Sequence, residues 1–168
     1  MKEYKYPLLA RFIYRYANIP ATFLLFIHLI VSISMISEKW YYILPVLINA
    51  LVIYILNRFY FKVYKYFPFK IFIDNERMVC SDFTLSDKEI KVKLVDIDKI
   101  TGGIFSGKLT HPYYIHERRH NITLGFFQHI KNFNGLLTII LSNIEKKLYH
   151  TLLDDMKKLG ESKRRGKK

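Results

Sequence analysis

The chain has 168 residues, of which 51% are hydrophobic and 16% aromatic, and its 27 Lys and Arg against 14 Asp and Glu give a net charge of +13. This length excludes a large multidomain enzyme. The single cysteine, Cys80, excludes an intramolecular disulfide framework and is typical of a protein from a reducing compartment.

We expect the first 16 residues to form an N-terminal cytoplasmic or interfacial segment. Leu8, Phe12 and Tyr16 are spaced four residues apart, and Pro7 suits a first helical position. This spacing fits a short helix lying in a membrane interface, and it fits equally a frayed extension of the apolar run that follows.

Two charge-free apolar runs come next, separated only by Glu38 and Lys39. At 1.5 Å per residue, each run approaches the roughly 30 Å thickness of a bilayer core. We therefore predict transmembrane helices over residues 17–37 and 40–62, joined as a hairpin. Basic residues flank the pair on both outer sides, so the positive-inside rule places both termini in the cytoplasm. The expected location is the inner (cytoplasmic) membrane, as a multi-pass protein.

The positive charge does not require a nucleic-acid partner. Lysines and arginines gather beside the spans and in a basic tail over residues 161–168, which we expect to be disordered. Anionic lipids of the cytoplasmic leaflet attract each such residue by about 1 kcal/mol. The sequence therefore predicts the membrane and its anionic headgroups as partners, and no nucleic acid.

Polar residues within the spans have two interpretations. His28 and Asn49 either mark a functional site or pack against a neighbouring helix. Ser32, Ser34, Asn49 and Asn57 give the spans mildly polar faces, which favour packing against a membrane-protein partner. An accessory structural subunit of a larger membrane complex is therefore one alternative function.

From Phe69 onward the apolar period becomes alternating, which predicts short antiparallel strands separated by turn residues. Asn134 and Gly135 form a strong hairpin-turn signal before the last apolar run. The expected fold is a small cytoplasmic α+β domain built as a β-barrel or sandwich of six to seven antiparallel strands. The predicted strands cover residues 69–73, 78–85, 90–97, 113–115, 122–126 and 136–141.

One helix is expected to close this domain. Residues 142–145 read Ser-Asn-Ile-Glu, which matches a capping box, and Gly160 stands where a C-terminal cap is expected. Apolar residues recur at helical spacing between them. This face consists of Ile144, Leu148, Leu152, Met156 and Leu159.

Residues 69–160 resemble the bacterial pleckstrin-homology-like (PH-like) domains found behind one or two membrane spans. The matching pieces are FKIFID at residues 69–74, VKLVDIDKI at residues 92–100 and the final helix. Val95 stands where an aromatic residue often precedes the Asp-Ile pair of that family. The resemblance implies an anchored binding or scaffolding module, usually without catalysis, and transfers no functional residues.

A zinc metalloprotease is the other alternative. His116-Glu117-Arg118-Arg119-His120 has the H-E-x-x-H pattern, in which two histidines bind zinc and Glu117 is the catalytic base. That chemistry requires a helix, whereas the flanking sequence predicts extended chain over residues 112–127 with a tight reversal in the middle. We therefore expect no cofactor and no catalysis, with zinc on His116 and His120 as the alternative.

The expected function is a non-catalytic, membrane-anchored PH-like module that docks a protein partner or anionic lipid at the inner leaflet. If lipid is the ligand, the candidate residues are Lys108, Arg118 and Arg119, because exposed basic loops beside a bilayer can clamp phosphate. The same residues also fit ordinary solvated turns.

Overall fold

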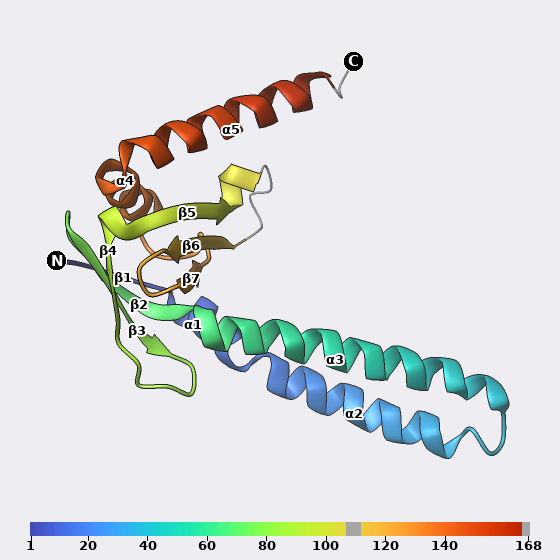
Figure 1. Ribbon diagram of the computed structural model, residues 1–168. Coiled ribbons are helices and arrows are strands. Elements are labelled where there is room, and N and C mark those ends of the chain that lie inside the picture. Colours follow the sequence, from blue (N-terminus) through green and yellow to red (C-terminus); the bar gives the residue numbers. More distant parts are fainter. Residues whose placement is uncertain (107–111, 166–168) are drawn as a thin grey trace. The chain divides into compact units, whose positions relative to one another are not determined.

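The computed structural model describes residues 1–106 and 112–165, with side chains as far as residue 161 (Figure 1). The chain forms two compact units. The helical unit is Leu8–Lys65, and the strand unit combines Met1–Pro7 with Tyr66–Lys168. The helical unit is thus inserted, in sequence, into the strand unit.

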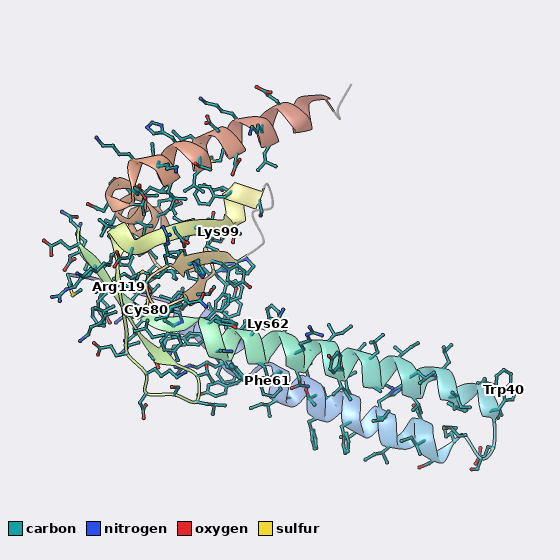
Figure 2. All side chains as sticks on the ribbon, in the orientation of Figure 1. Trp40, Phe61, Lys62, Cys80, Lys99 and Arg119 are labelled. Carbon is teal, nitrogen blue, oxygen red and sulfur yellow. The ribbon has the colours of Figure 1, made fainter. Side chains whose placement is uncertain are left out.

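The helical unit consists of three α-helices and one 3₁₀ turn. Helices α2 and α3 run side by side in opposite directions (Figure 1), and Trp40 lies at the turn between them whereas Phe61 lies toward the other end of α3 (Figure 2). The predicted helices over residues 17–37 and 40–62 are both present, and the second is longer than expected. The elements are α1 (Leu8–Tyr16), α2 (Asn18–Ser34), η1 (Trp40–Tyr42) and α3 (Ile43–Tyr66).

One continuous helix of this unit, Trp40–Tyr66, is long and apolar enough to cross a bilayer. Helices α1 and α2 meet at 41° and pass the same test only when the bent pair is counted as one span. Length and composition therefore provide one candidate span, or two with the bent pair, and the two-span hairpin stays a prediction.

The helices of this unit pack through a regular seam. The less exposed residues that α3 turns toward the other helix are spaced alternately three and four residues apart. This average of 3.5 residues is the repeat of left-handed helix pairs. Side-chain amides cross the seam: Asn57 donates to Thr22 at 2.9 Å, and Asn49 lies 2.6 Å from His28 Nδ1. The seam positions of α3 are Val46, Asn49, Ile53, Leu56 and Tyr60.

The described residues of the strand unit form two antiparallel sheets, two α-helices and two 3₁₀ turns. The four-stranded sheet has the order β1-β2-β3-β4, and the three-stranded sheet has the order β5-β6-β7. Helix α5 contacts β5 and η3, whereas α4 contacts η2. The elements are β1 (Lys2–Lys5), β2 (Pro68–Ile73), β3 (Arg77–Phe83), β4 (Ile90–Lys93), η2 (Leu94–Asp96), β5 (Ile97–Gly102), η3 (Gly103–Ser106), β6 (Tyr113–Glu117), β7 (Ile122–Phe126), α4 (Phe133–Asn143) and α5 (Lys146–Arg165).

The core of this unit follows from the alternation seen in the sequence. Alternate residues of β2 and β3 point to one face, so Ile71, Ile73, Met78 and Cys80 are all buried. Cys80 is 0% exposed and lies inside the strand unit (Figure 2). Burial also raises the pKa of its thiol, which suppresses the reactive thiolate.

Strand β1 was not predicted from the sequence. Residues 1–16 were expected to be one interfacial segment, but Lys2–Lys5 pairs with β2, with Tyr4 opposite Ile71. Tyr6 extends this attachment, because its hydroxyl accepts a hydrogen bond of 2.8 Å from the Phe127 N–H. Four largely polar residues are too few to show a strand period, and the partner strand supplies the pairing instead. Only α1, from Leu8, matches the expected helix.

The strand predicted at residues 136–141 is wrong, because this segment is helix α4. Its buried residues are Leu136, Leu137 and Ile140, whose spacing suits one face of a helix. The Asn134-Gly135 pair lies inside the helix and forms no hairpin turn. Asn132, two residues before Asn134, is the N-cap of α4: it has a φ of 55°, and its carbonyl accepts the Leu136 N–H.

The predicted limits of the last helix are also wrong at both ends. Ser142 belongs to the final turn of α4, Ile144 is extended, and α5 begins only at Lys146. Helix α5 continues through Gly160 to Arg165, so this glycine does not end the helix. The backbone of Gly160 does not adopt the positive φ that a glycine cap requires.

We predict that Gly125→Ala destabilises the strand unit by about 1–3 kcal/mol, the usual cost of overpacking a core. A Cβ at this position of β7 would lie 2.5 Å from the Phe67 ring, whereas a Cβ at Gly160 would meet nothing within 4 Å. The measurement is urea-dependent maleimide labelling of Cys80 in the full chain in detergent. Gly160→Ala is the matched control and should not weaken the protein. Equal labelling midpoints for Gly125→Ala and the wild type would contradict this packing.

Candidate functional site

Strands β6 and β7 form a hairpin whose turn carries the H-E-x-x-H residues. Glu117 pairs with Ile122 at the turn end, and Tyr113 pairs with Phe126 at the open end. The expectation of extended chain with a tight reversal over residues 112–127 is therefore confirmed. Asn121 closes the turn with a φ of 53°, a conformation that asparagine tolerates better than most residues.

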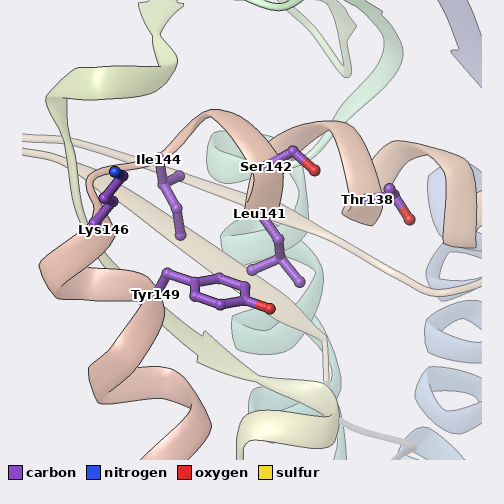
Figure 3. A pocket seen from close by; sticks show the side chains of 6 residues that line it. All are labelled: Thr138, Leu141, Ser142, Ile144, Lys146 and Tyr149. Atoms are coloured by element: carbon purple, nitrogen blue, oxygen red, sulfur yellow. The ribbon is translucent and has the colours of Figure 1, made fainter.

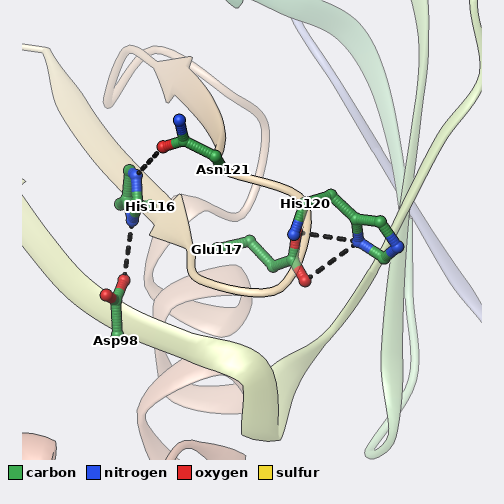
Figure 4. A network of polar contacts seen from close by, with 5 residues as sticks. All are labelled: Asp98, His116, Glu117, His120 and Asn121. Atoms are coloured by element: carbon green, nitrogen blue, oxygen red, sulfur yellow. Dashed lines mark hydrogen bonds and ion pairs between the residues drawn. The ribbon is translucent and has the colours of Figure 1, made fainter.

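The two histidines of the pattern do not converge. His116 and Glu117 are neighbours on a strand and point to opposite faces, so the His116 ring is partly exposed and Glu117 is 1% exposed. His116 points toward Asp98 and Asn121, whereas His120 points toward Glu117 (Figure 4). The helical arrangement that a zinc site of this type needs is not formed. No group of three or more metal-ligating side chains occurs in the described part of the chain.

Both ring nitrogens of His116 face oxygen atoms. Nδ1 lies 2.8 Å from Asp98 Oδ1, and Nε2 lies 3.0 Å from Asn121 Oδ1. Both contacts are hydrogen bonds at once only when both nitrogens carry protons, which describes the imidazolium. Asp98 first, and Asn121 second, raise the pKa of His116 above its usual value. His116 thus links β5 to the turn, and its protonated form makes both contacts.

Glu117 closes the turn from its buried side. One carboxylate oxygen accepts the His120 backbone N–H at 3.0 Å, and the His120 Nδ1 lies 3.0 Å from the same oxygen. A buried carboxylate requires such partners, because an unpaired charge is costly away from water. Glu117 therefore serves the turn rather than an open site where it could activate water.

A shallow depression lies beside this turn and combines both signs of charge. The Arg118 N–H donates to the Asp96 carbonyl at 3.1 Å, which ties the turn to η2 and brings both arginines next to acidic residues. Three carboxylates and two guanidinium groups share the depression, so it is not a uniformly positive surface. Its lining consists of Val95, Asp96, Ile97, Asp98, Arg118, Arg119 and Glu145.

The depression lies at the turn end of the β6–β7 hairpin, within the strand unit. Tyr6 and Phe67 stand next to the junctions with the helical unit, and both contact the open end of the β6–β7 hairpin, through Phe127 and Gly125. The turn is four residue steps away along the strands, or about 13 Å. Arg118 and Arg119 therefore lie at the turn end of this hairpin and not at its open end.

A second hollow lies where α4 turns into α5 (Figure 3). It is open and has both apolar and polar walls, with the Tyr149 ring beside Leu141. Neither paired carboxylates nor histidines line it. The lining residues are Thr138, Leu141, Ser142, Ile144, Lys146 and Tyr149.

The structure describes two of the three predicted lipid-binding residues. Lys108 lies outside the described residues, whereas Arg118 and Arg119 are brought together at one depression. The sequence interpretation missed Asp98 and Glu145, which line the same depression. Only the Asp-Ile-Asp run after β4 indicated that carboxylates gather here, and nothing in sequence spacing linked Glu145 to the turn.

Comparison of the chain with protein-family models, with curated proteins and with solved structures gives no match.

We predict that Asp98→Asn weakens the strand unit more at pH 5.5 than at pH 8.5. A raised folded-state pKa means that the His116 contact stabilises the protein fully below the usual histidine pKa, and this contribution is lost as the pH rises through the folded-state value. The measurement is the difference in Cys80 labelling midpoint between variant and wild type at each pH. Lys88→Gln, in an exposed loop, is the control and should show no such dependence. A difference that grows with pH would contradict the imidazolium.

Proposed function

We propose that this chain is a membrane-anchored, non-catalytic PH-like module that docks a protein partner at the inner leaflet of the cytoplasmic membrane. The single observation that carries the proposal is the distribution of polarity in the helical unit. That unit buries Asn18, Ser32 and Asn49 between its helices and exposes most of its aliphatic side chains, which is the reverse of a water-soluble helix pair.

Four residues show this reversal most clearly. Asn49 and Ser32 are 7% and 3% exposed, whereas Leu24 and Leu47 are 66% and 62% exposed. Only 6% of the most apolar stretch of Trp40–Tyr66 is buried, which contrasts with a core helix of a soluble protein. Polar seams and apolar outer faces suit helices that pack together in lipid, where each exposed polar group is costly.

The place in the sequence where the helical unit is inserted supports an anchor whose two ends lie on the same side of the membrane. The helical unit connects β1 to β2, and these strands are hydrogen-bonded neighbours with Lys5 opposite Lys70. Both ends of the hairpin therefore leave from one edge region of one sheet. If α2 and α3 both cross the membrane, both connections lie on the same side, in agreement with the basic residues that flank the pair.

The PH-like assignment is supported by the plan of the strand unit. It has one four-stranded and one three-stranded antiparallel sheet, followed by a long helix that contacts β5 and η3. In this proposal β1 is the first strand of the module, and the hairpin takes the place of the β1–β2 turn.

The charge pattern of the depression favours a protein partner over an anionic lipid. Asp96, Asp98 and Glu145 would repel a phosphate group held by Arg118 and Arg119. Surfaces with interspersed charges of both signs pair well with complementary protein surfaces, where they give specificity.

The topology prediction uses single cysteines in a Cys80→Ser background. Glu38→Cys, between the spans, should react with a membrane-impermeant maleimide only from outside intact cells. Lys88→Cys, in the exposed β3–β4 loop, should react only in inverted membrane vesicles. Labelling of both positions from one side, or release of the protein from membranes by carbonate, would overturn the anchoring.

The docking prediction uses a photoreactive amino acid at Val95, an exposed apolar residue that lines the depression. In intact cells it should form an adduct with another protein. Arg118→Glu with Arg119→Glu should reduce the adduct about fivefold or more, since an exposed ion pair contributes up to about 1 kcal/mol. Lys91→Glu with Lys93→Glu on β4 is the matched charge control and should leave the adduct unchanged. An adduct formed with lipid alone would contradict protein docking and favour a headgroup ligand.

A further inference from the structure

His28 contacts the seam of the helical unit through one ring nitrogen, but its side chain is exposed. His28 lies on α2 at the edge of the seam, where its Nδ1 is 2.6 Å from the Asn49 side-chain nitrogen. The other polar atoms of the seam are turned inward, but the His28 side chain is exposed. Its helical neighbours Leu24 and Val31 are also exposed, so the surface around it is aliphatic.

The contact with Asn49 determines which nitrogen of His28 carries the proton. An amide NH₂ group can only donate, so Nδ1 accepts and the neutral imidazole carries its proton on Nε2. Among the described residues, none forms a hydrogen bond with this Nε2–H group. His28 therefore presents a donor outward from the helix pair.

In a bilayer, His28 would lie so deep that leaving its Nε2–H group without an acceptor would cost free energy. His28 is ten residues after Asn18, the first residue of α2, or about 15 Å along the helix axis. In a hydrocarbon core of about 30 Å this is near the midplane, where no water is available to accept the proton. An unsatisfied donor at that depth is strongly unfavourable.

A second copy of the chain does not satisfy this donor by two-fold pairing. In a symmetric dimer the same patch meets itself, so two Nε2–H groups would face one another. One imidazole would have to change tautomer and give up its bond to Asn49. Ser32, the nearest hydroxyl on the helix, is buried and donates to the His28 carbonyl. A side-chain oxygen on a span of a different protein satisfies the Nε2–H group and leaves the bond to Asn49 in place.

We propose that the His28 edge of α2 binds a transmembrane helix of another protein that presents a side-chain oxygen near the membrane midplane. The partner fits the aliphatic surface around Leu24 and Val31 and accepts the hydrogen bond from His28 Nε2. This inference rests on the proposed membrane anchoring. It makes the chain one component of a heteromeric membrane complex and assigns the contact to one helix edge.

The test places a photoreactive amino acid at Leu24, one turn from His28, in the full chain at natural expression level in its own host. Phe26 is the control position, because it lies about 160° around the helix from His28 and is similarly exposed. We expect an adduct from Leu24, and not from Phe26, whose cross-linked peptide belongs to an apolar span containing Ser, Thr, Asn, Gln, Asp or Glu.

Substitutions at position 28 then test the hydrogen bond itself. His28→Leu keeps the span apolar and should reduce the Leu24 adduct to about a third, in line with the average strength of hydrogen bonds between membrane helices. His28→Gln, which retains a donor, should restore it. An adduct of twice the chain's mass, an adduct with lipid alone, or an adduct insensitive to His28→Leu would overturn the proposal while leaving the anchoring intact. Extraction of the protein by carbonate would instead show that the anchoring itself has failed.

Discussion

The pairing of β1 with β2 is the constraint on which the rest of the structure depends. Four residues at the start of the chain form one edge of a sheet whose next strand begins only after the whole helical unit. Closing so long a connection costs entropy, although the cost rises slowly with length. A stiff antiparallel helix pair lowers that cost, because it returns the chain toward its starting point. The helical unit therefore takes the role that a tight turn plays in an ordinary hairpin.

The two units distribute polar and apolar side chains in opposite ways, and the same rules of periodicity apply to both. In the strand unit, alternation places Ile71 and Ile73 inside and charged residues outside. In the helical unit, a 3.5-residue repeat places Asn49 and Tyr60 inside and leaves aliphatic side chains outside. Periodicity decides which residues share a face in both cases. Whether lipid or water surrounds a unit decides which face is buried. The polarity of the seam is therefore a better indicator of a membrane location than the length of the helices.

The sequence was most informative where one period extends over many residues. The helices of the insertion, strands β2 and β3, and the β6–β7 hairpin are all present close to where the patterns predict them. The misses have local causes: β1 is too short for a period, and the apolar run from Leu136 suits a strand or a helix equally by composition. At the candidate site, Arg118 and Arg119 were identified from sequence, but their acidic neighbours depend on how η2 and the start of α5 pack. Such contacts between distant segments leave no spacing signal in a single chain.

The opposite polarity of the two units also changes the meaning of a polar residue in each. Glu117 is buried in the strand unit, so its partners must be internal, and His120 supplies them. His28 sits on the outer face of an apolar helix pair, so an internal partner satisfies only one of its nitrogens. In water the second nitrogen would be solvated at no cost, and the residue would need no explanation. In lipid the same atom requires a protein acceptor. The need of His28 for a protein partner therefore depends on whether lipid or water surrounds its exposed nitrogen.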